Sequence, residues 1–287
     1  MHMRMVIGVD WSDEAFAAVQ QALLLYRPTE VSLVHGIDLG IFEYPALAQV
    51  GGLQGFEGFR WAVTAAGEAL LERTATTVYS ACPSVKQVNE TGNPARVILH
   101  EAHETKADIV VVGARGRSRI AEAVLGSVSH RVLMHSPCTT LIVRGGSRPV
   151  KRVLVAVEGK EDGGRIVQWL KDHPFKDSVE LCILSVVVPL GSDDPYLAAQ
   201  WQTWSAMAKA NADEIVKSVA ASLLLPAYTV RTHVATGNAA AVIAAEAEGM
   251  DLVVAASHGR HGLERFLLGS VSHSIVHRTA GPVLIIH

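Results

Sequence analysis

Three glycines in the first half of the chain are spaced so that the backbone around them could bind an anion. Gly113 directly follows an apolar run at residues 109–112, two residues separate it from Gly116, and nine more separate Gly116 from Gly126. Glycine has no Cβ atom, so backbone N–H groups can approach a ligand closely at these positions. The pattern predicts a buried strand that leads directly into a glycine-bearing loop.

Two serines, Ser127 and Ser129, lie at the start of a helical segment predicted around residues 128–134. The start of a helix offers unpaired N–H groups and the positive end of the helix dipole, and the serine hydroxyls add further donors. Together these groups predict a phosphate-binding cradle; alternatively, the glycines serve only tight turns. The segment lacks the Walker sequence Gly-Lys-Ser/Thr, and its glycine spacing differs from that of the dinucleotide fingerprint.

Alternating strands and helices are predicted to position these residues. In the first half we expect strands at residues 5–10, 31–37, 85–90, 109–112 and 140–143. We expect helices at residues 13–26 and 59–81, and a further helix that begins at Asn93 and Pro94, with the asparagine as its cap. Residues 38–58 are rich in glycine and predict a long loop.

This alternation predicts a parallel sheet, because strands joined by helices of ten or more residues form βαβ units. Such sheets bind ligands at the carboxyl ends of their strands. Asp10 and Gly113 both lie at carboxyl ends, so we expect them on the same rim. Asp10 has a second interpretation, as a carboxylate that caps a helix or closes a turn.

The hexapeptide LGSVSH occurs at Leu125–His130 and again at Leu268–His273, an offset of 143 residues (268 minus 125). A repeat of this size predicts that the two halves share a fold. The Gly/Pro-rich segment Arg144–Pro149 predicts a linker, so we expect domains at residues 1–146 and 147–287. In the second half we expect strands at residues 153–157, 179–188, 228–234, 252–255 and 283–286, a helix at 196–223 and a helix start at Asn238.

Composition limits the class of protein. Apolar residues make up 49% of the 287 residues and charged residues 18%, which predicts folded domains rather than disorder. The net charge of −3 gives no reason to expect a nucleic-acid partner. The three cysteines are far apart, so we expect no disulfide framework, and we also expect no signal peptide or membrane span. We expect a cytoplasmic protein.

The sequence resembles the universal stress protein family along nearly its whole length. The resemblance rests on VDWSDEA after the first strand, VHGID at the second, GNPA before the third helix and the G-x2-G-x9-G-S spacing, in the family's usual order. It implies α/β architecture with two tandem doubly wound domains, each a five-stranded parallel sheet of order 3-2-1-4-5 with helices on both faces. It also implies ATP, possibly with Mg, bound across the strand ends.

The resemblance assigns ATP contacts in the first domain. Asp10, beside Val9, would contact the ribose, and the backbone at Gly36 or Ile37 would contact the adenine. Gly36 stands where many relatives carry valine, so an apolar wall is lost there. The remaining ribose and phosphate contacts would come from Gly113, Gly116, Arg117, Gly126, Ser127, Val128 and Ser129.

The second domain departs further from the family pattern. Glu158 replaces the aspartate, inside EGKEDGG, and Ala256 replaces the first glycine. Alanine is costly at that position only if the backbone there needs a positive φ. The phosphate end is retained, which leaves nucleotide binding and a degenerate site both open. Its candidate residues are Gly259, Gly269, Ser270, Val271 and Ser272.

Other charged residues near these loops have two interpretations each. Arg115, like Arg117 and Arg119, could bind phosphate as a bidentate donor or could be a solvated loop residue. His273 and His277 are spaced i, i+4, as are metal ligands on a helix, but no third ligand or zinc-protease glutamate lies beside them. We therefore expect surface histidines and no metal site.

These features favour a protein that binds ATP as a regulatory ligand in stress response, with at most slow hydrolysis. We find no general base paired with a nucleophile, so we do not expect an efficient enzyme. The alternative is a non-nucleotide interaction scaffold of the same family, with empty or otherwise liganded pockets. We also expect an unknown regulatory protein partner, no membrane or nucleic-acid partner, and a homodimer.

Overall fold

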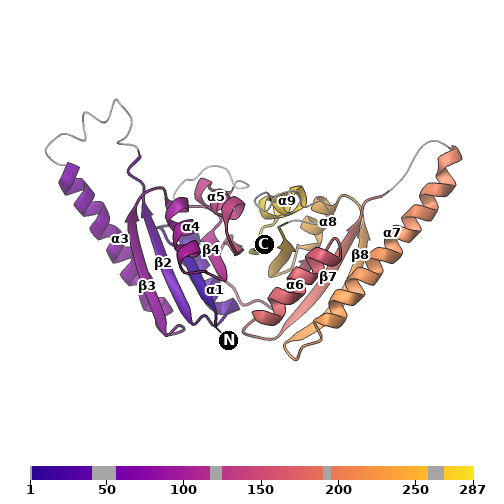
Figure 1. Cartoon of the computed structure of the whole chain (residues 1–287), viewed down its shortest axis with the longest axis horizontal. Coiled ribbons are helices and arrows are strands. Elements are labelled where there is room, and N and C mark those ends of the chain that lie inside the picture. The colour runs from indigo at the N-terminus through magenta and orange to yellow at the C-terminus, as the bar shows by residue number, and fades with distance from the viewer. Residues whose placement is uncertain (1, 41–55, 117–124, 190–194, 258–267) are drawn as a thin grey trace. The chain divides into compact units, whose positions relative to one another are not determined.

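The computed structural model describes residues 2–40, 56–116, 125–189, 195–257 and 268–287. Its backbone contacts divide the chain into two compact units, Met1–Ser147 and Arg148–His287. Each unit is an α/β fold built on parallel strands, and each is described by itself below (Figure 1).

The N-terminal unit contains a five-stranded sheet. Its strands are β1 (Arg4–Gly8), β2 (Glu30–Ile37), β3 (Ser84–Thr91), β4 (Ile109–Gly113) and β5 (Thr139–Val143). Neighbouring strands pair in parallel in the order β3-β2-β1-β4-β5. This is the predicted order 3-2-1-4-5, and it reverses between β1 and β4, where doubly wound sheets bind ligands.

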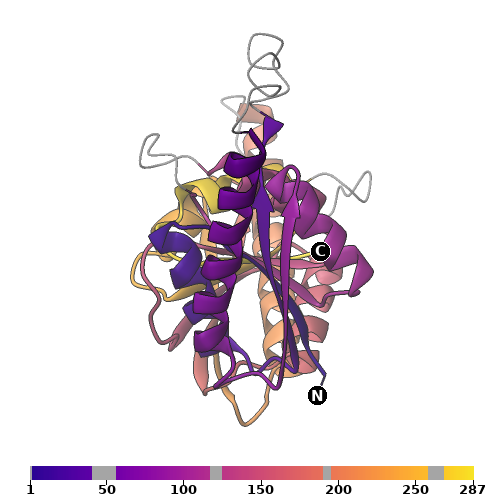
Figure 2. The same ribbon diagram turned by 90° about the vertical axis from the view of Figure 1, so that its left-hand side faces the viewer.

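Helices cover both faces of this sheet. They are α1 (Asp13–Leu25), α3 (Phe56–Val78), α4 (Pro94–Glu104) and α5 (Ser127–His135). The contacts pair α1 with α3 on one face and α4 with α5 on the other, and Figure 2 shows α3 and α4 on opposite sides of the strands. Every residue of β4 and β5 is buried, as expected of parallel strands between two helix layers.

Local sequence signals set most helix boundaries. The hydroxyl of Ser12 accepts a hydrogen bond from the backbone N–H of Ala15, and the side chain of Asn93 accepts one from Arg96, as predicted for N-caps. The helix predicted at residues 59–81 instead spans Phe56–Val78. It begins earlier than predicted because its first turn includes Gly58, and glycine inside a helix lowers helix stability by only about 1 kcal/mol relative to alanine. Most of the predicted loop at residues 38–58 lies outside the described residues.

The C-terminal unit repeats the architecture. Its strands are β6 (Arg152–Ala156), β7 (Val179–Val187), β8 (Tyr228–Thr236), β9 (Leu252–Ala256) and β10 (Val283–Ile286), in the parallel order β8-β7-β6-β9-β10. Its helices are α6 (Lys160–Asp172), α7 (Pro195–Ser222), α8 (Ala239–Glu246) and α9 (Ser270–Arg278). Within the part of the chain that the structure describes, no helix is long and apolar enough to cross a membrane.

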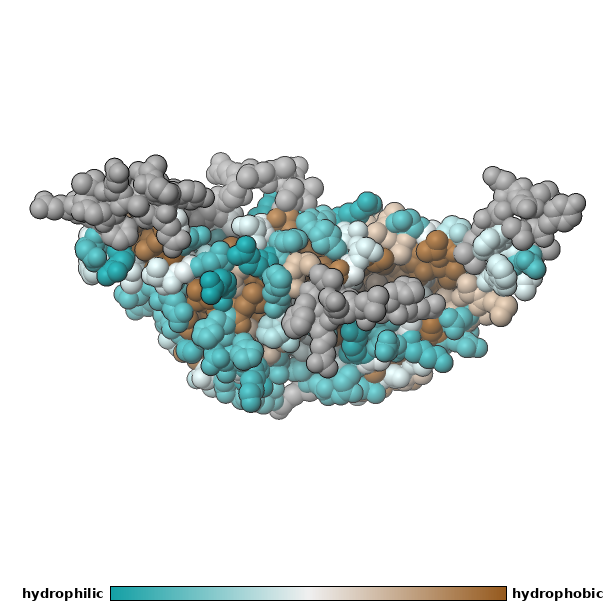
Figure 3. Space-filling model, turned by 45° about the horizontal axis from the view of Figure 1, so that its top comes forward, coloured by the Kyte–Doolittle hydropathy of each residue, from teal (hydrophilic) through white to brown (hydrophobic). Residues whose placement is uncertain are grey.

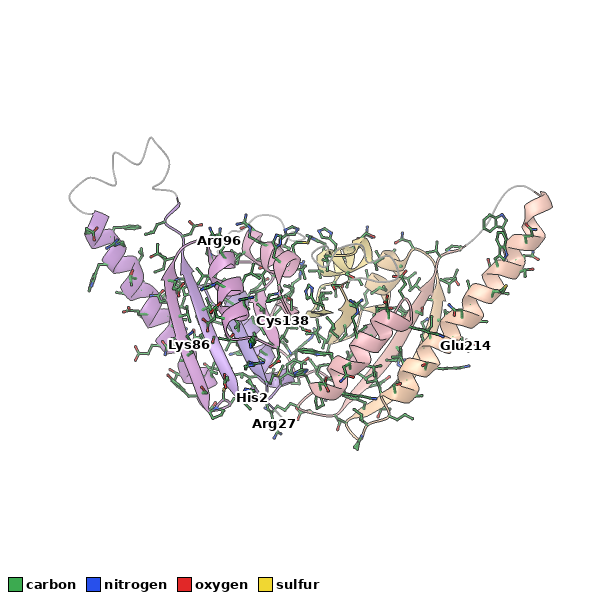
Figure 4. All side chains as sticks on the ribbon, in the orientation of Figure 1. His2, Arg27, Lys86, Arg96, Cys138 and Glu214 are labelled. Carbon is green, nitrogen blue, oxygen red and sulfur yellow. The ribbon has the colours of Figure 1, made fainter. Side chains whose placement is uncertain are left out.

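The strand registers make the two units directly comparable. Gly8 at the end of β1 pairs with Val34 of β2, and Ala156 at the end of β6 pairs with Leu184 of β7. Position 34 therefore corresponds to 184, and position 36 to 186. In Figure 4, Arg96 marks the upper end of the N-terminal unit and His2 its lower end, so the carboxyl ends of this unit's strands point upwards.

Candidate functional site

A cavity of about 220 Å³ lies at the carboxyl ends of β1, β2 and β4 in the N-terminal unit. It brings together most of the residues that the sequence singles out, including Asp10 and Gly113 on one rim. The predicted residues that line it are Val9, Asp10, Gly36, Gly113, Gly116, Gly126, Ser127, Val128 and Ser129. Arg117 lies outside the described residues.

The cavity also has walls that the sequence analysis missed. They are Gly8, Ala15, Val34, His35, Pro94, Ile98 and Val112; the lining also includes Arg115, which the sequence analysis named. Most of these side chains are apolar and lie on elements already predicted, one or two positions from a predicted residue or on the first turns of α4. The predicted strand order could have indicated these residues, because it places the end of β2 and the start of α4 beside β1.

Asp10 both closes a turn and faces the glycine loop. Its Oδ1 accepts a hydrogen bond from the backbone N–H of Ser12 at 2.9 Å, and also one from the Ser12 hydroxyl. Its Oδ2 lies on the other side, 2.6 Å from where a Cβ atom of Gly116 would be. The two interpretations of Asp10 are therefore compatible, because each uses a different carboxylate oxygen.

Gly113 is required by packing and not by its backbone conformation. A Cβ atom there would lie 2.8 Å from the carbonyl carbon of Glu14 and 3.0 Å from the backbone nitrogen of Ala15. Its φ is not in the left-handed region, since the described positive-φ glycines are Gly92, Gly145, Gly237 and Gly249. The absent side chain therefore lets the first turn of α1 pack against the end of β4.

The guanidinium of Arg115 binds a carboxylate of the protein. Its Nε and Nη2 donate to Oε1 of Glu14 at 3.1 and 2.9 Å, and its backbone N–H donates to Oε2 at 2.6 Å. This bidentate pair fixes the loop after β4 onto α1. Neither sequence interpretation of Arg115, as a phosphate ligand or a solvated residue, describes this role. Burial and the charge of Arg115 together lower the pKa of the nearby Arg144.

The start of α5 presents backbone donors to the cavity. Its N-cap is Gly126, with no side-chain capping bond, so the first N–H groups of the helix have no intrahelical acceptor. The residues that carry them, Ser127, Val128 and Ser129, all line the cavity. The hydroxyl of Ser129 itself donates to the carbonyl of Gly113 at 2.6 Å, so this hydroxyl holds the strand end, and the backbone N–H remains the predicted phosphate donor at this residue.

The end of β2 places one of the two predicted residues at the cavity. The carbonyl of Ile37 accepts a hydrogen bond from the N–H of Gly92 at 2.9 Å, and Ile37 is not among the lining residues. The wall is formed by Val34, His35 and Gly36, and Nδ1 of His35 is 2.8 Å from the carbonyl oxygen of Val9. Of the two predicted positions, Gly36 therefore lines the cavity and Ile37 does not.

A second cavity, of about 330 Å³, lies at the same place in the C-terminal unit. The predicted residues Gly269, Ser270, Val271 and Ser272 line it, together with Glu158, whereas Gly259 lies outside the described residues. The Ser272 hydroxyl donates to the carbonyl of Ala256 at 2.7 Å, as Ser129 does to Gly113. Ala256 does not have a positive φ, so alanine is not strained there.

Asp162 is a lining residue that the sequence analysis missed. It is buried, and its two carboxylate oxygens accept hydrogen bonds from the backbone N–H groups of Glu158 and Gly159, both at 2.7 Å. It occupies the third position of α6, from which a carboxylate reaches back to the N-cap. The sequence EGKEDGG could have indicated this role, because Asp162 follows the N-cap residue Gly159 by three positions. The turn that Asp10 holds in the first unit is thus held by Asp162 in the second.

The histidines do not form a metal site within the described residues. The rings of His273 and His277 lie 4.4 Å apart, and Nδ1 of His103 is 3.3 Å from a carboxylate oxygen of Glu104. Among the described residues, no group of three or more His, Cys, Asp or Glu side chains could hold a metal ion.

Burial raises the pKa of the Cys138 thiol to about 12, so this thiol is protonated at neutral pH.

The fold and the two cavities define a tandem, doubly wound α/β protein with a ligand cavity at the strand ends of each unit. The family model described as "Universal stress protein family" matches residues 1–144 and again residues 149–287. The chain therefore belongs to the universal stress protein family, as a tandem of two family domains.

Individual relatives agree with this assignment. The chain is 26% identical over 290 residues to a universal stress protein of Mycolicibacterium smegmatis, covering 98% of this chain and 96% of the relative. It is 30% identical over 148 residues to YxiE of Bacillus subtilis, covering 50% of this chain and all of the relative (100%). Its fold is similar to that of a universal stress protein from Archaeoglobus fulgidus, with a TM-score of 0.63 at 20% identity, over 99% and 95% of the two chains.

Proposed function

We propose that the N-terminal unit binds ATP as a regulatory ligand in stress response. The observation that carries the proposal is the uncapped start of α5, whose backbone donors line a cavity that Asp10 also lines. Donors of this kind, with the positive end of the helix dipole, suit the charge of a triphosphate. Oδ2 of Asp10, which lies toward Gly116, suits a ribose hydroxyl as an acceptor.

Hydrolysis at this site is proposed to be slow at most. Among the described lining residues, the Ser129 hydroxyl and the His35 ring are both bonded to backbone carbonyls, so neither is set up as a nucleophile with a base. A Mg²⁺ ion bound with the nucleotide would be held mainly by phosphate oxygens and water, because the described residues offer no ligand cluster of their own.

The setting of this function is also part of the proposal. We propose a cytoplasmic homodimer in which ATP binding selects the conformation that a regulatory protein partner recognises. Family membership supports this setting. Sedimentation that gives a single-chain mass at every micromolar concentration would exclude the homodimer without affecting the ATP site.

The test is the nucleotide content and affinity of two matched variants. Proline is tolerated at the first helical position, and Gly126 has the extended φ and ψ of −64° and 155° that the residue before proline adopts. Ser127→Pro therefore deletes one amide donor without disturbing α5, and Ser270→Pro makes the same change in α9. Mass spectrometry of the small molecules released on denaturation, together with calorimetric titration of ATP, should show a loss with Ser127→Pro only.

A further inference from the structure

The two cavities are lined by different chemistry although their positions correspond. At the end of the second strand, Gly36 in the N-terminal unit corresponds to Val186 in the C-terminal unit. Both line their cavities, and Leu184 stands in place of Val34. The C-terminal cavity therefore has larger apolar side chains on this wall.

The start of α8 and the residue after β7 add further apolar side chains to the lining of the C-terminal cavity. Ala239 stands at the first position of α8 and Ile243 one turn further on, and Val188 extends the β7 wall towards solvent. The exposed fraction of Val188 is 59%, which is high for a valine. Figure 3 shows apolar side chains on the C-terminal unit at the right, and others on the N-terminal unit at the left. A cavity of about 330 Å³ with such walls fits a ligand with an apolar body.

The polar groups of this cavity are few and unevenly placed. Its described lining residues include two carboxylates, Glu158 and Asp162, and no lysine, arginine or histidine. A triphosphate carries several negative charges and would meet both carboxylates without a basic side chain among these residues to offset them. Among the described residues, the lining therefore favours a ligand with one negative charge over a ligand with several.

One negative charge can nevertheless be held at the start of α9. Its N-cap, Gly269, makes no side-chain capping bond, and Gly269, Ser270, Val271 and Ser272 line the cavity. The backbone N–H groups there have no intrahelical acceptor, and they suit a carboxylate. The Ser272 hydroxyl is bonded to Ala256, so the head group would be held by main-chain donors.

We propose that the C-terminal cavity binds a monoanionic amphiphile: an acyl chain along Leu184, Val186 and Ile243, with its carboxylate on the first amides of α9. The two halves of the chain then sense different ligands, a nucleotide in the first and an acyl carboxylate in the second. This proposal does not depend on ATP binding in the N-terminal unit.

The test measures the binding of decanoate to the full chain by calorimetric titration and by native mass spectrometry. We expect saturable binding of one decanoate per chain. Decanol, which lacks the charge, should bind with an affinity lower by about tenfold or more. Ser270→Pro and Val186→Gln should each reduce decanoate affinity about tenfold or more. Ser127→Pro, in the N-terminal unit, and Leu224→Gln, at a residue whose exposed fraction is 75%, should leave it unchanged.

Three results would overturn the proposal. The first is an absence of saturable decanoate binding by the unaltered chain. The second is binding that survives both Val186→Gln and Ser270→Pro, with circular dichroism showing that both variants are folded. The third is competition by ATP for decanoate in the Ser127→Pro variant, which would make the C-terminal cavity a nucleotide site. If Ser270→Pro proves unfolded, Val186→Gln alone decides between these results and the expected one.

Discussion

A Cβ atom on Gly36 would lie 2.5 Å from the Cα atom of Pro94, so the end of β2 and the start of α4 are in direct backbone contact. This contact closes one wall of the N-terminal cavity, of which both residues are part. Glycine at position 36 was expected to remove an apolar wall, and the start of α4 forms that wall instead. In the C-terminal unit the corresponding wall is made by Val186, with Ala239 at the start of α8.

Replacing Gly36 by valine should destabilise the N-terminal unit by about 1–3 kcal/mol, because backbone atoms of α4 must move to make room. Urea denaturation measures the loss. Gly58→Val is the matched control, since no atom lies within 4 Å of a Cβ atom at that position. Equal stability of the two variants would show that β2 and α4 are not in contact.

Gly113→Ala and Gly126→Ala should differ in stability although the two residues stand at the two ends of the same connection, between β4 and α5. At Gly113 the new methyl would meet backbone atoms of Glu14 and Ala15 at 2.8 to 3.0 Å, which predicts a loss of about 1–3 kcal/mol. At Gly126 the nearest atom is the carbonyl oxygen of Ala114 at 3.4 Å, an ordinary contact. We expect Gly126→Ala to melt within a few degrees of the unaltered chain, and a reversed order would contradict the packing described.

Glu14→Ala should loosen the loop that follows β4. The change removes the acceptor of three hydrogen bonds from Arg115 and leaves that guanidinium without its carboxylate, at a cost of about 1–3 kcal/mol. Thermal melting measures the stability, and ATP titration should show weaker binding because Gly116 lies on the same loop. Asp13→Ala removes the same charge from the same helical turn at an exposed residue. Its effect should be no more than about 1 kcal/mol.

Tyr228 should make the C-terminal unit sensitive to alkaline pH. Its hydroxyl donates to the carbonyl of Leu170 at 3.0 Å and accepts from the N–H of Phe175 at 3.2 Å. Burial raises its pKa from 10.0 to about 12, against a smaller opposing effect of the Phe175 bond. The folded state therefore holds this proton more tightly than the unfolded state does.

The raised pKa of Tyr228 makes the unit less stable at alkaline pH. The contribution of Tyr228 is fully present below pH 10 and is lost as the pH rises towards about 12. Tyr228→Phe should lower stability at neutral pH by about 1–2 kcal/mol and flatten the fall between these pH values. Urea midpoints measured across this range provide the comparison. Tyr79→Phe, at a tyrosine whose exposed fraction is 58%, should keep the slope of the unaltered chain.

The architecture could be predicted from the sequence because its signals are local or periodic. Apolar runs indicated the strands, Asn93 and Pro94 indicated a helix start, and the LGSVSH repeat indicated two related halves. The predicted order 3-2-1-4-5 is confirmed in each unit by the strand pairing. The positions of the two cavities follow from this order, because strand ends meet where it reverses.

The directions of individual side chains could not be predicted, because each depends on a partner far away in the chain. Arg115 is bound by Glu14, 101 residues earlier, and the Ser129 hydroxyl is bonded to Gly113, on the preceding strand. The sequence alone determined that this chain is a duplicated, doubly wound α/β protein with backbone donors at the start of α5 and of α9. Only the tertiary structure decided which polar groups are already satisfied by other protein groups, and that decision depends on packing between distant segments.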